Sequence, residues 1–452
     1  MALRHGIDFG KAQALHQQEL ALFSERRPRS RQLSAAGGEH LLFGAPLHWM
    51  ADWSTPFNLY VEEARGARLR DVDGHEYLDF CLGDTGAMFG HSPAPVARAI
   101  AKQATRGLTA MLPSPDAVWV AEELARRFGL SHWQFAISAS DANRFALRWL
   151  RAASGRGQIV VFNGCYHGTV DDVFVDLVDG QPRRRASLLG QVHDLAAHTR
   201  VVEFNDLEAL ELALRDEQVA CVLAEPVMTN IGMVMPEPGF WRAAQDLIRR
   251  YGSYLLLDET HTISSGPGGY GAAYGLKPDA LVLGKPLGGG LPCAVYGFSA
   301  ELAERAQRAK RAAAPGHSGI GTTLSGNMLA SAAMRANLAE VMSDAAYQRM
   351  FALAQHLADG LLDWIERWRL PWCVSRVGAR CEFQFSPRPP RNGGEAGAMQ
   401  DEELERIIHL YLLNRGFLIT PFHNMLLLCP ETEFADVDRL LAALDGFAGE
   451  VV

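Results

Sequence analysis

Short apolar runs alternate with amphipathic helical stretches through the middle of the chain, and this alternation limits the possible fold more than any other feature. The apolar runs are residues 134–137, 158–162, 199–204, 219–225, 254–259, 280–284 and 293–299. The helical stretches between them lie near 93–106, 115–128, 140–153, 206–215 and 238–251. Alternating strands and helices form mostly parallel sheets that helices cover. The sequence therefore predicts an α/β fold with a large domain over residues 81–325.

The regions on either side of this alternation predict a small α+β domain. Residues 8–25 have the spacing of an amphipathic helix, and residues 57–80 read as a small sheet with a tight turn at Asp73-Gly74. Toward the C-terminus, helices are expected near 325–343, 344–368, 401–415 and 434–447, strands at 372–377, 380–385, 417–420 and 425–429, and a loop at 386–398. We expect residues 1–80 to join the small domain and residues 326–452 to form its C-terminal part.

Composition excludes several classes of protein. The 452 residues are 48% hydrophobic and 21% charged, with a net charge of -9 and a pI near 5.9, so neither disorder nor a nucleic-acid or membrane partner is expected. Seven scattered cysteines form no CxxC pair, which argues against a disulfide framework and a metal site. The sequence shows no secretion signal and no apolar run long enough to span a membrane, and we expect a cytoplasmic protein.

Two ionisable residues follow apolar runs at the predicted sheet edge. Asp258 ends the run YLLLD, and Lys285 follows ALVLG, 27 positions later. Ligands bind at the carboxyl ends of strands in open α/β sheets, and a lysine there can attack a carbonyl. The hypothesis is a Schiff base between Lys285 and pyridoxal phosphate, with Asp258 beside the pyridine nitrogen. The alternative is an exposed lysine at a glycine turn and an aspartate that caps a loop.

Four further segments are candidates for the site, and the first three of them stand where strands end. Ser138 to Asn143 turn from a strand into a helix, which suits an anion such as phosphate, although Ser140 or Asp141 as a helix cap explains the same pattern. The segment GCYHG brings an aromatic ring that could stack on a flat ligand or pack in the core. Glu225 either supports the site or caps a loop. Residues 319–327 form a second candidate anion cradle.

Together these segments resemble a known family. The motifs DVDGHEYLDF, GCYHG, EPVMTNIGMVMPEPGF, LLLDETHT, LGKPLGGGLPCAVYG and TLSGN occur in that order between residues 57 and 445. They resemble the class III aminotransferases of pyridoxal-phosphate fold type I, and look most like glutamate-1-semialdehyde aminomutase and its aminotransferase relatives. The resemblance implies that Lys285 is the Schiff-base lysine and proton shuttle and that Asp258 pairs with the pyridine nitrogen. The other cofactor-binding residues that it implies are Ala139, Ser140, Tyr166, His167, Glu225, Thr260 and, from the neighbouring subunit of a homodimer, Thr323.

The resemblance implies a reaction class more firmly than a substrate. We expect an aminotransferase that moves an amino group from an amino acid or primary amine to a carbonyl acceptor in a ping-pong reaction. The alternative is an isomerase, either an aminomutase of the glutamate-1-semialdehyde type or an amino-acid racemase. The carboxylate-binding arginines of relatives have no counterpart in FGAPLHWMADW or HNMLLLCPETE. Arg380 is a candidate replacement, and an ordinary ion-paired arginine explains it equally well.

Overall fold

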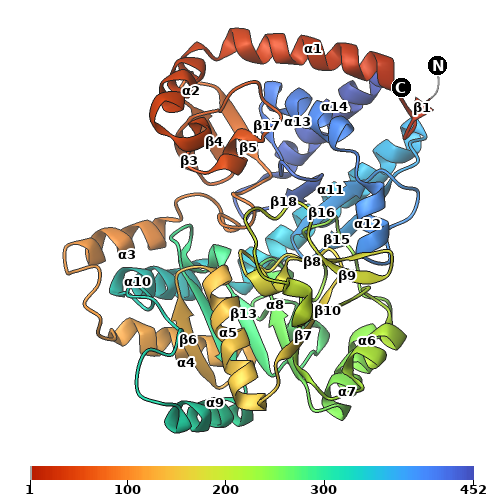
Figure 1. Cartoon of the computed structure of the whole chain (residues 1–452). Coiled ribbons are helices and arrows are strands. Elements are labelled where there is room, and N and C mark those ends of the chain that lie inside the picture. The colour runs from red at the N-terminus through yellow and green to blue at the C-terminus, as the bar shows by residue number, and fades with distance from the viewer. Residues whose placement is uncertain (1–2) are drawn as a thin grey trace. The chain divides into compact units, whose positions relative to one another are not determined.

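The structure is a computed structural model that describes residues 3–452, and the chain divides into two compact units (Figure 1). The larger unit consists of Ala94–Tyr347 and Pro390–Ala398. The smaller unit contains the residues up to Pro93, together with Gln348–Pro389 and Met399–Val452. The predicted domains were 1–80, 81–325 and 326–452. The two units begin and end at different residues, and the predicted domain boundaries stay a prediction.

A seven-stranded sheet forms the centre of the larger unit, in the order β10-β7-β11-β12-β13-β14-β6 (Figure 1). Strand β14 pairs antiparallel with both of its neighbours, and the other pairings are parallel, so the predicted α/β fold with a mostly parallel sheet is confirmed. The strands are β6 (His132–Ala136), β7 (Gln158–Phe162), β10 (Thr199–Val202), β11 (Val219–Ala224), β12 (Tyr254–Asp258), β13 (Ala280–Leu283) and β14 (Ala294–Phe298).

The central strands are buried on both faces, which explains their unbroken apolar sequences. Every residue of β11, β12, β13 and β14 is buried. Helix α5 (Ala139–Ser154) packs against β11, β13 and β14. The other helices of this unit are α3 (Ala94–Ala104), α4 (Pro115–Phe128), α6 (Leu207–Leu214), α7 (Phe240–Arg250), α8 (Gly269–Tyr274), α9 (Ala300–Ala312) and α10 (Met328–Ala336).

The smaller unit contains the two-stranded sheet of β1 (Leu3–Arg4) and β2 (Ile7–Asp8), and two larger sheets. One has the order β17-β5-β4-β3 and the other β15-β16-β18. Their strands are β3 (Val61–Arg65), β4 (Arg68–Asp71), β5 (Glu76–Asp79), β15 (Cys373–Val377), β16 (Arg380–Gln384), β17 (Phe417–Leu418) and β18 (Met425–Leu427). Its helices are α1 (Phe9–Arg26), α2 (Pro28–His40), α13 (Glu402–Asn414), α14 (Phe434–Val451) and most of α11 (Asp344–Trp368). Apolar residues of α1, α11, α13 and α14 share one core.

The predicted loop at 386–398 is wrong over its second half, because α12 (Gly393–Met399) forms there. Asn392 caps this helix through the backbone N–H of Glu395, at 2.9 Å. A side chain at Gly393 would meet the backbone oxygen of Asn163 at 1.8 Å, so glycine is required for close packing rather than for a turn. The sequence analysis also gave no element for α2, α8, α9 or the hairpin of β8 (Val175–Val178) and β9 (Gln181–Arg184).

Among residues 3–452, no helix combines the length and the apolar character that a bilayer crossing requires.

Glu259 ties the end of β12 to the start of α8. The buried carboxylate accepts backbone hydrogen bonds from Tyr270 at 2.5 Å and Gly271 at 2.8 Å. These N–H groups belong to the first turn of α8, where no helical carbonyl can pair with them. Burial raises the pKa of Glu259 to about 7, despite the opposing backbone donors. The residue after Asp258 is therefore a structural anchor for the segment that follows the sheet edge.

We expect Glu259→Ala to lower the free energy of unfolding by about 2–5 kcal/mol, because two buried N–H groups would lose their acceptor. Urea unfolding followed by circular dichroism measures this loss. The matched control is Glu304→Ala on the exposed surface of α9, which should change stability by less than about 0.5 kcal/mol. Equal stabilities of the two variants would contradict the anchoring role of Glu259.

Candidate functional site

The carboxyl ends of the strands in the larger unit surround a cavity of about 280 Å³. That volume is close to the lower end of small-ligand sites, roughly 300–1,000 Å³. Its walls come from the segments after β6, β7, β11, β12 and β13. The lining residues that the sequence analysis predicted as site residues are Ala139, Ser140, Tyr166, His167, Glu225, Asp258, Thr260 and Lys285.

Asp258 is a buried carboxylate of the cavity and accepts three hydrogen bonds. Its Oδ2 accepts hydrogen bonds from Asn143 Nδ2 at 2.8 Å and from His167 Nδ1 at 3.0 Å. Its Oδ1 accepts the backbone N–H of Thr260 at 3.1 Å. Asn143 also donates to the backbone oxygen of His167 at 3.0 Å, which fixes the three side chains as one unit.

This network decides the charge of Asp258. Burial alone would raise its pKa, but the hydrogen bond and charge of His167, with further donors, lower the pKa of Asp258 to about 2. The pKa of His167 shifts in the opposite direction. Burial disfavours the charged imidazole, but the Asp258 carboxylate favours it and raises the pKa of His167. Asp258 therefore stays ionised across the neutral range although it is buried.

Lys285 is held in an unusual backbone conformation at the end of β13. Its φ of 42° lies in the left-handed region, which costs a residue with a side chain about 1–2 kcal/mol. The turn after it is fixed by Asn337, whose Nδ2 donates to the backbone oxygens of Pro286 at 2.8 Å and Leu287 at 2.9 Å. The Lys285 amine lies 2.6 Å from His261 Nε2.

The segment at the start of α5 forms a tight cradle. The backbone N–H of Thr169 donates to Ser140 Oγ at 3.0 Å. Gly168 has a φ of 80°, and a side chain there would meet Ser140 Oγ at 2.2 Å. A side chain at Gly284 would meet the Ala139 methyl at 2.9 Å. The free N–H groups of the first helical turn can bind an anion where these close contacts shape the entrance.

Glu225 faces the cavity from the end of β11. Its Oε2 accepts hydrogen bonds from Thr229 Oγ1 at 2.8 Å and Asn230 Nδ2 at 2.9 Å. Burial raises the pKa of Glu225. The backbone N–H of Tyr166 points to Glu225 Oε1 at 3.5 Å. Glu225 thus anchors the loop that carries Tyr166 and also lines the cavity.

Thr323 is the predicted site residue that the structure does not bring to this cavity. It is exposed and lines a different cavity of the larger unit, together with Trp133, Phe135 and Tyr296. Its predicted role in a neighbouring subunit stays a prediction.

Asn143 and His261 are site residues that the sequence analysis did not assign. Asn143 is completely buried within α5, and a buried amide needs a hydrogen-bond partner. An asparagine on the buried face of this helix is therefore the feature that points to a polar partner. His261 lies three residues beyond the end of β12, in the quoted motif LLLDETHT, and is 6% exposed. Its neighbour Lys285 is distant in sequence, so their contact depends on the pairing of β12 with β13.

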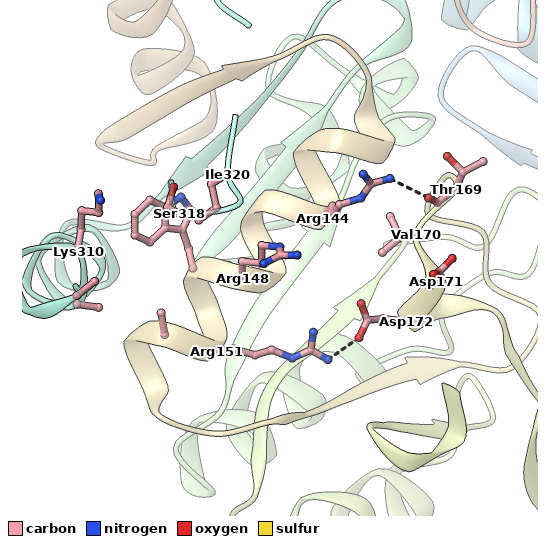
Figure 2. Close-up of a pocket in the computed structure, with 14 residues that line it drawn as sticks. Arg144, Arg148, Arg151, Thr169, Val170, Asp171, Asp172, Lys310, Ser318 and Ile320 are labelled. Atoms are coloured by element: carbon pink, nitrogen blue, oxygen red, sulfur yellow. Dashed lines mark hydrogen bonds and ion pairs between the residues drawn. The ribbon is translucent and has the colours of Figure 1, made fainter. Parts of the chain in front are cut away.

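A larger cavity, of about 750 Å³, lies along α5 and contains none of the predicted site residues (Figure 2). Arg144, Arg148 and Arg151 project into it from α5, and Lys310 faces it from α9. Arg151 is paired with Asp172 at 2.6 Å, and Arg144 donates to a backbone oxygen at 3.3 Å. We place the chemistry in the smaller cavity, because it unites a buried carboxylate with the lysine at the strand ends.

The smaller cavity suits pyridoxal phosphate. Within residues 3–452, His167 Nε2, Asn143 Oδ1 and Thr260 Oγ1 are buried polar atoms without a hydrogen-bond partner. An ionised aspartate, a lysine amine and free helix N–H groups are the donors and acceptors that a pyridine nitrogen, an aldehyde and a phosphate would require.

Comparison with known proteins identifies the family. The family model described as "Aminotransferase class-III" matches residues 49–445. A glutamate-1-semialdehyde 2,1-aminomutase of Anaeromyxobacter sp. (strain K) is 33% identical over 393 residues, which cover 85% of this chain and 89% of that protein. The crystal structure of a glutamate-1-semialdehyde-aminomutase from Pseudomonas aeruginosa PAO1 is 51% identical, covers 98% of this chain and 99% of that chain, and has a TM-score of 0.96.

Two further structures extend the comparison. A variant of the Pseudomonas aeruginosa protein in complex with PMP is 50% identical, with a TM-score of 0.97, and covers 99% of this chain and 100% of that chain. An omega-transaminase from Sphaerobacter thermophilus is 25% identical, with a TM-score of 0.84, and covers 94% of this chain and 99% of that chain. The chain belongs to the class III aminotransferase family of fold type I, whose cofactor is pyridoxal phosphate.

Proposed function

We propose that the protein is an aminomutase that moves an amino group between two carbons of one small substrate, of the glutamate-1-semialdehyde type. The observation that carries this proposal is the 51% identity, over 98% of the chain, to the glutamate-1-semialdehyde-aminomutase of Pseudomonas aeruginosa PAO1. Relatives named glutamate-1-semialdehyde 2,1-aminomutase, such as the one 33% identical over 85% of the chain, support it. The proposal replaces transfer between two molecules, the main expectation from the sequence.

Lys285 and Asp258 would carry the chemistry. Pyridoxal phosphate, when bound, withdraws electrons from the carbon that carries the amino group. The ionised Asp258 would hold a proton on the ring nitrogen, which preserves this electron withdrawal. Lys285 would bind the cofactor aldehyde and, once displaced by substrate, carry a proton between neighbouring carbon atoms at its Nζ. The low pKa of Asp258 and the cavity position of Lys285 support these roles.

The remaining cavity residues would hold the cofactor in place. Ala139 and Ser140 would bind the phosphate through backbone N–H groups and the Ser140 hydroxyl, which the close packing at the start of α5 supports. Tyr166 and Thr260 would contact opposite faces of the ring. His167 would act through Asp258, and Glu225 would hold the loop of Tyr166.

We further propose a cytoplasmic homodimer. Thr323 would contact the phosphate of the neighbouring subunit, which agrees with its exposure and with its place in a different cavity of its own chain. The seven cysteines are free and buried, which supports a reducing compartment.

A second candidate function is transfer of the amino group to a separate carbonyl acceptor. Two observations favour it. The segment FGAPLHWMADW at residues 43–53 has no match to the arginine that the resemblance to the aminomutase implies for binding a substrate carboxylate. The omega-transaminase of Sphaerobacter thermophilus shares the fold over 94% of the chain. One experiment separates the two functions.

Glutamate-1-semialdehyde that carries ¹⁵N on its amino group should be converted without any added acceptor. An aminomutase gives an isomer of equal mass in which the amino group has moved from carbon 2 to carbon 1, and the label stays in the product pool. Carbon and nitrogen NMR of the mixture measures the position of the amino group and the fraction of ¹⁵N that stays in the product. A conversion that starts only when a keto acid is added, and that passes the ¹⁵N to this acid, would show an aminotransferase instead.

Lys285→Ala should reduce the rate of this conversion at least about 10³-fold, because both attack on the aldehyde and proton movement depend on its amine. Single-turnover absorbance kinetics measure the loss. The control is Lys310→Ala in the cavity of Figure 2, which should keep the wild-type rate. A Lys285→Ala protein with the wild-type rate would refute the assigned role.

Gly168→Ala should weaken pyridoxal phosphate binding at least about tenfold, because the new methyl would displace Ser140 from the cradle. Gly155→Ala is the matched control: Gly155 has a φ of 71° against 80° for Gly168, but a side chain there meets nothing within 4 Å. Both variants place a side chain at a similar positive φ. Absorbance titration of the cofactor-free proteins measures affinity, and equally weak binding by both variants would argue against the cradle.

A further inference from the structure

Three arginines of α5 face a cavity that shares no lining residue with the cavity of Lys285. Arg144, Arg148 and Arg151 have the spacing of one helix face, and Figure 2 shows all three side chains on the same side of α5. Like charges at this spacing destabilise a helix. The chain as a whole has 52 acidic and 43 basic residues, so this local excess of positive charge runs against its composition. An anion bound between the arginines would offset their repulsion.

Protein carboxylates neutralise one of these arginines and only approach a second. Arg151 Nη2 lies 2.6 Å from Asp172 Oδ1 in an ion pair. Arg144 donates to the backbone oxygen of Thr169 at 3.3 Å, and its Nη1 lies 4.0 Å from Asp141 Oδ1. Both contacts of Arg144 are long for charge-assisted hydrogen bonds, which span about 2.7–2.9 Å. Arg144 can therefore bind a further acceptor without losing a strong bond.

Arg148, between the other two arginines, has neither a hydrogen bond nor an ion pair within residues 3–452. Packing nevertheless holds its guanidinium, since a side chain at Gly319 would meet Nη1 at 2.8 Å and Cζ at 3.3 Å. Gly319 has a φ of 72°, so a glycine both permits this turn and leaves room for the guanidinium. Arg148 is also exposed. Its donors are therefore positioned by the fold and open to an anion.

The rest of the cavity offers an apolar wall. The apolar side chains that line it, apart from an indole, are Val170, Ile320, Ala152, Ala309 and Ala313. The indole belongs to Trp149, whose Nε1 donates to the hydroxyl of Tyr296 at 3.2 Å and so fixes the ring. The cavity volume of about 750 Å³ lies within the range of small-molecule sites, roughly 300–1,000 Å³. There is thus room for a carbon skeleton beside the arginines.

We propose that this cavity binds a small organic phosphate monoester, whose phosphate is held by Arg144 and Arg148. The lining contains four cations and two carboxylates, Asp171 and Asp172, and so carries a net charge of +2. A phosphate monoester carries about −1.5 to −2 charges at pH 7, and its oxygens match the paired donors of guanidinium groups. A monocarboxylate would neutralise only half of the net charge. The site is separate from Lys285, so the proposal goes beyond the proposed function and does not depend on it.

Isothermal titration calorimetry of the full-length protein tests this proposal, with phenyl phosphate as the probe. The protein is first loaded with pyridoxal phosphate, which blocks the cavity of Lys285. The comparison ligands are benzoate, succinate and inorganic phosphate, which lack the phosphate, the phosphate and the carbon skeleton, respectively. The variants are Arg144→Gln, Arg148→Gln and Arg148→Lys. Arg242→Gln is the matched control, because Arg242 is an exposed helical arginine of α7 that does not line the cavity.

We expect the wild type and Arg242→Gln to bind phenyl phosphate with affinities within about twofold of each other. Arg144→Gln and Arg148→Gln should bind it at least about tenfold more weakly, because each loses charge-assisted hydrogen bonds. Arg148→Lys should fall between these values, since it keeps the charge but not the planar fork of donors. The wild type should bind each comparison ligand more weakly than phenyl phosphate. Thermal melts check folding, and Arg148→Lys decides if a glutamine variant is unfolded.

An affinity for phenyl phosphate that is unchanged in both glutamine variants would overturn the proposal, and so would the absence of binding to the wild type at millimolar concentration. Equal affinities for benzoate or succinate would overturn the choice of a phosphate. If phenyl phosphate does not bind and Arg148→Gln lowers the molar mass in analytical ultracentrifugation, the arginines serve a contact between copies of this chain instead.

Discussion

Burial of the ionised Asp258 carboxylate is the constraint on which the site depends. A carboxylate in a nonpolar interior is stable only when donors replace the lost water. Here Asn143 comes from α5, His167 from the loop after β7, and the N–H of Thr260 from the segment after β12. Meeting this one requirement therefore joins three separate segments. The loop that supplies His167 also carries Tyr166 and Gly168, so the same bonds fix the two segments for which we propose contact with the cofactor ring and phosphate.

The strand-end residues could be predicted because they follow from local patterns. Asp258 and Lys285 each end an apolar run, and adjacent parallel strands bring such ends to one edge. Asn143 and His261 could not be predicted in this way, since their partners lie 115 and 24 positions away and depend on packing between elements. The prediction of a loop where α12 forms was wrong for a different reason. Its glycines suggested a loop, whereas one of them is needed for contact with Asn163.

The backbone of Lys285 shows how the fold stabilises a conformation that the residue alone avoids. Strain of about 1–2 kcal/mol persists only where the surroundings hold it. Asn337 provides this support through two carbonyl hydrogen bonds, and β13 fixes the residues before the turn. The strained turn brings Lys285 to the wall of the cavity, where its amine lies 2.6 Å from His261 Nε2. A relaxed backbone would send the same side chain in another direction, so the cost in stability has a function.

Movement of an amino group within one skeleton and its passage to a second molecule require the same first steps. In the proposed function Lys285 and Asp258 would serve both, because each reaction needs an aldehyde bound at a lysine and a protonated ring nitrogen. The difference lies in what happens next: an aminomutase must retain its substrate until the group has moved, whereas an aminotransferase releases one product first. Sequence differences between aminomutases and aminotransferases of the family should therefore change how long the substrate stays bound. We expect such differences at residues around the substrate more than at Asp258, His167 or Lys285.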